Sequence, residues 1–171
     1  TNHDTSEVNK LHFYYDAQGR VALVDFNGTL YSYAHNLQGD IIGILDTSGN
    51  LVVEYKYDAW GKPVSTIVFL TNELAGLNPF RYREYVWDEA ICIYYLRNRY
   101  YLTEKCRFLS CDQRKDQTFN SKESNLFCYC INNQLSHCDE KGESVFNQKT
   151  NFSLDTFYIR GDVFFAFMLY Q

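Results

Sequence analysis

The sequence contains very little methionine or proline. One Met and two Pro occur among 171 residues, against 15 Tyr and 13 Phe. Aromatic side chains pack well on the pleated surface of a sheet, so this bias favours strands over a helix bundle. The length is that of a single domain and is sufficient for a hydrophobic core. The composition therefore predicts an all-β protein.

An excess of positive charge is also lacking. The formal net charge is -5 and the pI is about 5.3, so no basic field attracts phosphate backbones or anionic lipid. The longest apolar run, residues 163–170, is far shorter than the about 20 residues of a membrane-spanning helix. The first residues, TNHDTSEVNK, lack the basic and apolar regions of a signal peptide. We expect no nucleic-acid partner and no membrane insertion.

Turn signals at regular spacing are the strongest pattern in the sequence. An Asp or Asn at the first position of a turn accepts a hydrogen bond from the backbone two residues on, and a Gly at the last position tolerates positive φ. Five such pairs, with successive starts 9, 11, 10 and 12 residues apart, predict structural turns: Asp16 with Gly19, Asp25 with Gly28, Asn36 with Gly39, Asp46 with Gly49, and Asp58 with Gly61.

The segments between these turns have the length and composition of strands. They are rich in Val, Ile, Leu and Tyr, as in RVALVDF, TLYSYAH, DIIGILD and LVVEYKYD. One strand and one turn in about every ten residues predict an antiparallel meander of short hairpins, continuing as part of a larger repetitive sheet. The alternative is a chance run of glycine turns in an ordinary β domain.

Four motifs follow one another over about residues 13–143: YYDAQGRV, YKYDAWGKP, NPFRYREYVWDEAICIYYLRNRYYLTEKCRFLSCD and YCINNQLSHCDEKG. With these motifs the chain resembles the YD-repeat (RHS) proteins and their RHS repeat-associated core domain. The resemblance implies that YD repeats occupy residues 1–65, the core 66–143 and a short C-terminal extension 144–171. In that family many repeats form a hollow β-shell and the core closes one end of it.

The resemblance also implies partners and a location. The expected partners are upstream YD repeats of the same parent chain and an encapsulated C-terminal passenger. The family includes bacterial polymorphic toxins and other secreted or cell-surface proteins. The tail, residues 143–171, is too short to fold as a toxin domain of its own, and its portion FYIRGDVFFAFMLY is expected to add to a sheet edge or to lie inside a shell.

The resembled family carries a cis-acting aspartyl protease, in which one carboxylate activates water and a second, protonated carboxyl polarises the scissile carbonyl. The Asp of its R-F-L-S-x-D motif matches Asp112 in RFLSCD, and the candidates for the second carboxylate are Asp116 and Asp139. The corresponding cleavage site lies between Glu143 and Ser144. A lone Asp such as Asp112 is otherwise most often a turn or capping residue.

Several residues depart from the family pattern and weaken the expectation of cleavage. Cys92 and Cys106 stand where the family has glycine, which removes freedom at positive φ. Glu143 brings a charge to a position where the family buries an apolar side chain. We predict little or no self-cleavage. The Asp-Pro pair and three further prolines of the family are replaced by Leu102, Thr103, Gln113, Gln134 and Glu140.

Arginine and aromatic residues alternate along residues 81–108. Such alternation predicts a polar sheet surface on which guanidinium groups stack beside rings, since exposed alternation is usual in antiparallel sheets. The same surface is a candidate for binding carbohydrate or a partner. The residues are Arg81, Arg83, Arg97, Arg99 and Arg107 with Tyr82, Tyr85, Tyr94, Tyr95, Tyr100, Tyr101 and Phe108.

The six cysteines present a rival chemistry. Zinc ligands usually occur as C-x₂₋₄-C pairs, and neither Cys128-x-Cys130 nor the adjacent His137 and Cys138 has that spacing. We predict no metal and no cofactor, and unpaired thiols rather than a disulfide framework. The leading hypothesis for function is therefore a structural, encapsulating end of an RHS-repeat shell without catalysis of its own. The alternatives are the cis-acting aspartyl autoprotease and binding on the Tyr/Arg surface.

Overall fold

The described part of the protein is almost entirely β-structure. The structure is a computed structural model that describes residues 8–70, 73–112, 125–135, 137–139, 142, 156–160 and 163–165. These residues form an eight-stranded and a four-stranded antiparallel sheet, and their one α-helix is the single turn α1 (Leu74–Leu77). The prediction of an all-β fold is confirmed. Among the described residues, no helix has the length and apolarity needed to cross a membrane.

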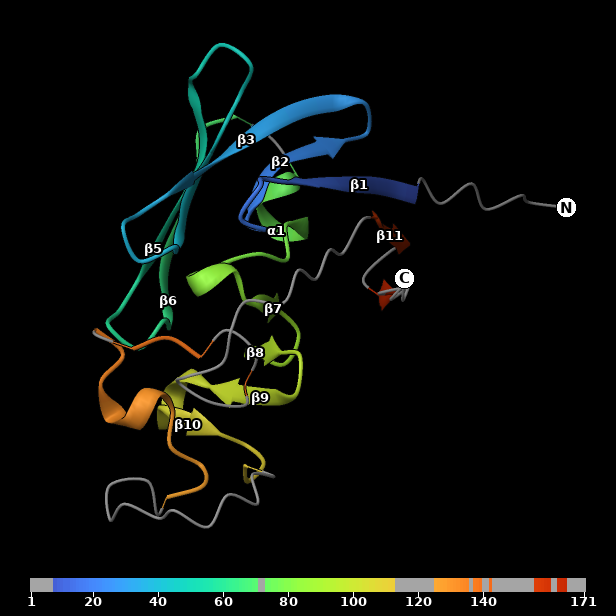
Figure 1. Ribbon diagram of the computed structural model, residues 1–171. Coiled ribbons are helices and arrows are strands. Elements are labelled where there is room, and N and C mark those ends of the chain that lie inside the picture. Colours follow the sequence, from blue (N-terminus) through green and yellow to red (C-terminus); the bar gives the residue numbers. More distant parts are fainter. Residues whose placement is uncertain are drawn as a thin grey trace, which may run out of the picture.

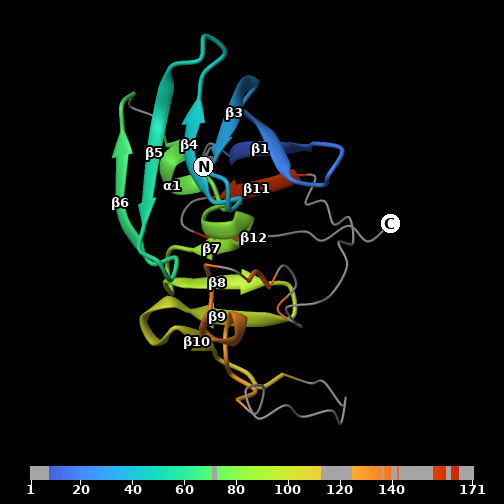
Figure 2. The same ribbon diagram turned by 60° about the vertical axis from the view of Figure 1, so that its left-hand side comes forward.

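From β1 to β6 the large sheet is a meander in which each strand pairs with its neighbours in the chain, and β11 and β12 add to the outer edge of β1. Its spatial order is β12-β11-β1-β2-β3-β4-β5-β6, and all of its pairs are antiparallel (Figures 1 and 2). The strands are β1 (Val8–Tyr15), β2 (Val21–Phe26), β3 (Thr29–His35), β4 (Ile41–Leu45), β5 (Leu51–Tyr57), β6 (Pro63–Val68), β11 (Thr156–Arg160) and β12 (Val163–Phe165).

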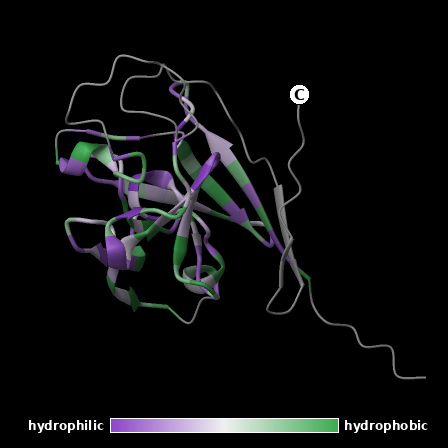
Figure 3. Ribbon diagram, turned by 90° about the horizontal axis from the view of Figure 1, so that it is seen from below, coloured by the Kyte–Doolittle hydropathy of each residue, from purple (hydrophilic) through white to green (hydrophobic). Residues whose placement is uncertain are grey.

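The short strands alternate between polar and apolar positions. In β1, Leu11 and Phe13 are buried while their neighbours His12 and Tyr14 are partly or fully exposed, as the two-residue period of a strand requires. Coloured by hydropathy, the strands show hydrophilic and hydrophobic residues in turn (Figure 3). The large sheet therefore has one face that needs a cover.

Local hydrogen bonds explain why the chain reverses at the Asx and Gly corners. In four of the five turns the first carbonyl accepts a bond from the glycine amide and the first side chain accepts bonds from two later amides. In the last of these turns, for example, Asp58 Oδ1 accepts from the amides of Trp60 at 2.8 Å and Lys62 at 2.9 Å, and Gly61 has φ +82°.

The β2–β3 turn is built differently from the sequence prediction. Asp25 lies inside β2, and the reversal is made by Asn27 (φ 52°) and Gly28 (φ 86°). Asn-Gly tolerates positive φ at both central positions and so forms a tight two-residue hairpin. The Asp25 side chain still contributes, because its Oδ1 accepts a 2.6 Å hydrogen bond from the Gly28 amide.

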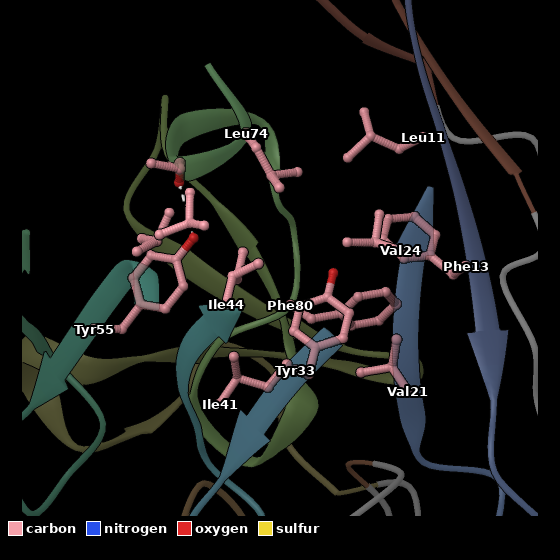
Figure 4. Packing of buried hydrophobic residues seen from close by; sticks show 13 residues of the cluster. Leu11, Phe13, Val21, Val24, Tyr33, Ile41, Ile44, Tyr55, Leu74 and Phe80 are labelled. Atoms are coloured by element: carbon pink, nitrogen blue, oxygen red, sulfur yellow. Dashed lines mark hydrogen bonds between the residues drawn. The ribbon is translucent and has the colours of Figure 1, made fainter. Parts of the chain in front are cut away.

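The inner face of the large sheet is covered by the segment that follows β6. Leu74 and Ala75 of α1, together with Phe80, complete a hydrophobic cluster with buried residues of β1 to β5 (Figure 4). Phe80 meets Phe13 edge to face, with ring centroids 4.9 Å apart. The buried hydroxyl of Tyr33 donates to Asn78 Oδ1 at 2.6 Å, so the cover is held by polar contacts as well as by burial.

The small sheet lies beyond this cover and has an aromatic core. Its order is β10-β9-β8-β7, and its strands are β7 (Val86–Asp88), β8 (Ile93–Leu96), β9 (Arg99–Leu102) and β10 (Arg107–Phe108). Short 3-10 turns flank it at Tyr82–Glu84, Thr103–Lys105 and Cys130–Asn132. The buried residues of its cluster are Tyr82, Tyr85, Trp87, Tyr94, Leu96, Tyr101, Phe108, Tyr129 and Cys130.

Candidate functional site around Arg99

Two of the three carboxylates that the sequence singled out meet at one arginine. The Nη2 atom of Arg99 lies 3.0 Å from Asp139 Oδ2 and 3.5 Å from Asp112 Oδ2. The Arg99 and Asp139 side chains are 6% and 2% exposed, and that of Asp112 is 19% exposed. The third candidate, Asp116, lies outside the described residues, as do Glu143 and Ser144.

Strand alternation explains why Arg99 points inward. Along β9, Arg99 and Tyr101 are buried whereas Tyr100 between them is exposed. The guanidinium carbon of Arg99 then lies 3.6 Å from the centroid of the Phe108 ring, which is a cation–π distance. The arginine is therefore part of the aromatic core, with an apolar ring on one side and carboxylates at its tip.

Arg99 also binds two backbone carbonyls from downstream segments. Its Nε donates to the carbonyl of Gly142, and its Nη1 donates to the carbonyl of Leu126 at 3.3 Å. Together with the two aspartates, these bonds connect β9 to residues near positions 112, 126, 139 and 142. We call Arg99, Asp112, Asp139, Gly142 and the Leu126 carbonyl the Arg99 cluster.

Gly142 fits the Arg99 cluster only because it has no side chain. Its φ is +66°, and a Cβ atom at this position would lie 2.7 Å from the Leu96 carbonyl oxygen and 3.2 Å from the Arg99 amide nitrogen. The residue that precedes the sequence-predicted cleavage region is thus locked against the β8–β9 hairpin. Its carbonyl, held by Arg99, belongs to the Gly142–Glu143 peptide bond, one bond before the predicted Glu143–Ser144 site.

The charge pattern of the cluster is that of an ion-pair network. One guanidinium contacts two carboxylates, and two backbone carbonyls accept hydrogen bonds from its Nε and Nη1 atoms. An aspartyl protease dyad differs, since its two carboxyls share one proton and leave room for a water. The cluster therefore brings a candidate carboxylate pair beside a backbone carbonyl, with an arginine between them that organises all three.

A second set of polar contacts fixes the small sheet to the last turn of the meander. Three consecutive carbonyls of the Asp58–Gly61 corner accept hydrogen bonds from three tyrosine hydroxyls of the small-sheet region. The bonds are Tyr82 to Ala59 at 3.4 Å, Tyr101 to Trp60 at 2.9 Å and Tyr94 to Gly61 at 3.0 Å. We call this contact the tyrosine joint.

Further bonds reach neighbouring turns at the same end of the sheet. The carbonyl of Arg81 accepts from the Ile41 amide at 3.2 Å, the Arg83 amide donates to Asp40 Oδ1 at 3.1 Å, and Glu84 Oε2 accepts from the Val21 amide at 3.2 Å. Val21, Asp40 and Gly61 all flank alternate turns of the meander, which lie at one rim of an antiparallel sheet. The small-sheet region is therefore seated on one rim of the large sheet.

The interpretation of the Arg/Tyr alternation as an exposed polar surface is wrong for its central members. Tyr82, Tyr85, Tyr94 and Tyr101 are at most 4% exposed, and Arg81 is 4% exposed. Arg81 lies 4.1 Å over the ring of Tyr55 and donates to the Ala75 carbonyl at 2.7 Å. The second layer formed by α1 and the joint covers what a single sheet would expose. A binding surface composed of these tyrosines is thus not available.

The cysteines do not assemble into a site. All six lie in the described part of the chain and no disulfide joins them. The described residues contain no group of three or more His, Cys, Asp or Glu side chains arranged to hold a metal ion. Burial raises the pKa of the Cys130 thiol to about 12, as expected for a thiol packed inside an apolar cluster.

Sequence reasoning missed Arg99 and the tyrosine joint as organising features. Arg99 was one of five arginines that alternate with aromatic residues along residues 81–108. Nothing in its spacing indicates that it is the arginine that binds both aspartates. The joint was also hidden, because its acceptors are backbone carbonyls. The one signal for it was the Trp-Gly end of the Asp58 turn, which differs from the polar ends of the earlier turns.

Comparisons with known proteins place these features in context. No protein-family model matches the chain. It is 36% identical over 140 residues to the "tRNA3(Ser)-specific nuclease WapA" of Bacillus spizizenii, an alignment covering 82% of this chain and 6% of that protein. It is 38% identical over 115 residues to the "tRNA nuclease WapA" of Bacillus subtilis (strain 168), covering 67% of this chain and 5% of that protein.

The fold is shared with part of a solved structure. The crystal structure titled TcdB2-TccC3-Cdc42 superimposes with a TM-score of 0.67 at 23% identity, over 81% of this chain and 7% of that chain. This likeness shows the fold. In all three comparisons the chain spans less than a tenth of the length of the protein it matches.

Proposed function

Because this chain belongs to the YD-repeat (RHS) proteins, we propose that it forms the closing end of an RHS β-shell, without catalysis of its own. On this proposal residues 1–65 are the last YD repeats, 66–143 are the core that closes the shell, and 144–171 are a short extension. The parent is then a polymorphic toxin or cell-surface protein that is secreted or displayed, and its upstream repeats and a C-terminal passenger are the partners.

The tyrosine joint is the observation that carries this proposal. The core segment binds the carbonyls of Ala59, Trp60 and Gly61 and also contacts the ends of β2, β3 and β4. All of these positions lie at one rim of the meander. A segment that binds every second turn along one rim of a meander is suited to close that rim of a repeat sheet.

Electron cryomicroscopy of the complete polypeptide that carries this sequence tests the proposal. We expect a continuous antiparallel sheet upstream of β1 that curves into a hollow wall, with residues 73–142 seated across its end. A parent in which the core segment is detached from the sheet rim, or in which no repeat sheet continues from β1, would overturn the shell-end role.

A cis-acting aspartyl autoprotease is the second candidate, because Asp112, Asp139 and the Gly142 carbonyl all meet Arg99. In that mechanism one carboxylate takes a proton from the attacking water, while the other, protonated carboxyl donates its proton to the oxygen of the scissile carbonyl. The arginine between the carboxylates and the charge of Glu143 favour the structural role.

Intact-mass spectrometry separates the two candidates. The structural role predicts a single mass for the purified chain after prolonged incubation. The protease role predicts two fragments, a split abolished in Asp112→Ala and retained in Asp88→Ala, a control at the end of β7 whose carboxylate binds nearby amides of the following turn. The fragment masses also distinguish the Gly142–Glu143 bond, whose carbonyl Arg99 holds, from the Glu143–Ser144 bond expected from the sequence.

A further inference from the structure

The outer edge of β1 is occupied by a strand from the far end of the chain. Strand β11 pairs antiparallel with β1 over five positions, from Val8 opposite Arg160 to His12 opposite Thr156. Figure 2 shows β11 beside β1. Strand β2 pairs with the other edge of β1 and continues the repeat sheet. The pairing joins residues that are about as far apart in sequence as this chain allows.

This pairing breaks the rule that the rest of the large sheet follows. From β1 to β6 each strand pairs with the strand next to it in the chain. By that rule, the outer edge of β1 is the position that a preceding strand of the same repeat pattern would take. Strand β11 therefore occupies the position that the repeat pattern predicts for a preceding repeat strand.

The backbone of β1 shows which groups form this edge. The Lys10 amide donates to Asn27 Oδ1 at 2.8 Å and the Lys10 carbonyl accepts from the Asn27 amide at 3.0 Å, so both polar groups of Lys10 point toward β2. Because backbone groups alternate sides along a strand, those of Asn9 and Leu11 point to the outer edge. The register places Ile159 opposite Asn9 and Phe157 opposite Leu11.

The edge is held rigidly by side chains on the inner face of β1. Leu11 is fully buried and Phe13 is 2% exposed in the cluster under the sheet. The Asn9 side chain donates to Glu73 Oε2 at 2.9 Å, next to α1. Strand β1 therefore presents its Asn9 and Leu11 backbone groups in a fixed line, which lowers the entropy lost when a strand pairs with it.

We propose that the outer edge of β1 is a strand-acceptor site and that residues 156–160 occupy it as an exchangeable strand. Main-chain hydrogen bonds supply the affinity, as in other cases of strand addition to a sheet edge. The C-terminal segment covers backbone donors and acceptors that would otherwise invite association between edges. A preceding repeat strand and this segment are competitors for one site. The acceptor site is independent of the shell-end role and is tested on this chain alone.

Amide hydrogen exchange on the full chain tests the occupancy. We expect the Asn9 and Leu11 amides to be protected, and Ile159→Pro, which removes a donor facing Asn9, to increase their exchange rates at least about tenfold. The Lys10 and His12 amides point to β2 and serve as internal controls that remain protected. Equal protection of Asn9 and Leu11 in the parent chain and in Ile159→Pro would falsify the assigned occupancy.

A synthetic peptide tests exchangeability. The peptide spans residues 154–161 and is added to the Ile159→Pro chain, where we expect it to restore protection at Asn9 and Leu11. N-methylation at Ile159 removes a donor that faces β1, so this peptide is expected to have no effect. N-methylation at Tyr158 alters a donor that faces away from β1 and should leave the peptide active. If the two methylated peptides behave alike, or if the unmodified peptide restores nothing, the acceptor site is ruled out.

Discussion

Gly61 lies directly against the ring of Tyr82. A Cβ atom on Gly61 would lie within 3 Å of three ring atoms of Tyr82, including Cγ at 2.6 Å. Gly61 also has φ +82°, and its carbonyl accepts the Tyr94 hydroxyl at 3.0 Å. One residue thus supplies the corner of the last repeat turn, a seat for one tyrosine and an acceptor for another. The YKYDAWGKP stretch is both a turn and the joint between the two sheets.

Gly61→Ala is expected to destabilise the protein more than Gly49→Ala. Both glycines have φ +82°, so both substitutions introduce left-handed strain of about 1–2 kcal/mol. A Cβ on Gly49 meets nothing within 4 Å, whereas a Cβ on Gly61 overlaps the Tyr82 ring and adds about 1–3 kcal/mol of overpacking. Urea titration measures the difference in the free energy of unfolding. Equal losses of unfolding free energy in the two variants would mean that the Tyr82 ring moves away from the added methyl group at no measurable cost.

Removing Arg99 is expected to destabilise the small-sheet region strongly. Arg99→Ala breaks the buried ion pair with Asp139 by removing its positive charge, a change that typically costs about 3–5 kcal/mol. Asp112→Asn is the milder comparison, because Asp112 is 19% exposed and 3.5 Å from the guanidinium. Thermal unfolding followed by tyrosine fluorescence reports both. A loss in Arg99→Ala no larger than in Asp112→Asn contradicts a central role for the arginine.

We expect the protein to become more stable when glycine replaces cysteine at two positions where the family carries glycine. Cys92 has φ 54° and Cys106 has φ 53°, so both adopt the left-handed conformation without a glycine's freedom. Cys92→Gly and Cys106→Gly should each raise the free energy of unfolding by up to about 1 kcal/mol, the left-handed strain less the entropy of glycine in the unfolded chain. Cys111 has no positive φ, so Cys111→Gly should lower stability slightly. Stabilisation by all three substitutions would point to the loss of the thiol instead.

The repeat sheet could be predicted from the sequence because its information is local. Asp58 and Gly61 make their own turn through bonds to residues at most four positions away, and the strand between two turns needs only its alternation. The prediction was less accurate at Asp25, where the tighter Asn-Gly hairpin shifts the corner by one residue. Local rules do not rank two overlapping turn signals.

The candidate site depends on contacts that no local pattern contains. Asp112 and Asp139 are 27 residues apart and come together only because Arg99 points inward from β9. Whether an alternating strand exposes or buries its tyrosines depends on what packs against the sheet. The burial of Tyr94 and Tyr101 could therefore not be predicted from the sequence of their own strands. A strand-like tail was foreseeable, and its pairing with β1 was not, because strand addition uses backbone groups that every sequence has.

Alkaline pH is expected to unfold the protein, because burial raises the pKa of many tyrosines above their usual value near 10. Desolvation is the leading cause for Tyr33, Tyr85, Tyr94 and Tyr129. In the folded state these hydroxyls keep their protons above pH 10, whereas in the unfolded state they lose them. The unfolded state then binds fewer protons, so stability is fully present below about pH 10 and falls as the pH rises further.

The slope of that fall is the measurable quantity. Each buried tyrosine contributes up to about 1.4 kcal/mol per pH unit above its unfolded pKa. Denaturant titrations from neutral pH into the alkaline range, read beside tyrosinate absorbance, give the slope and the number of late-titrating hydroxyls. Tyr94→Phe should reduce the slope by the contribution of one tyrosine, because burial raises the pKa of the Tyr94 hydroxyl. Tyrosinate absorbance that rises at a lower pH than the unfolding transition would contradict the prediction, because it would show that water reaches the hydroxyls of the aromatic core in the folded state.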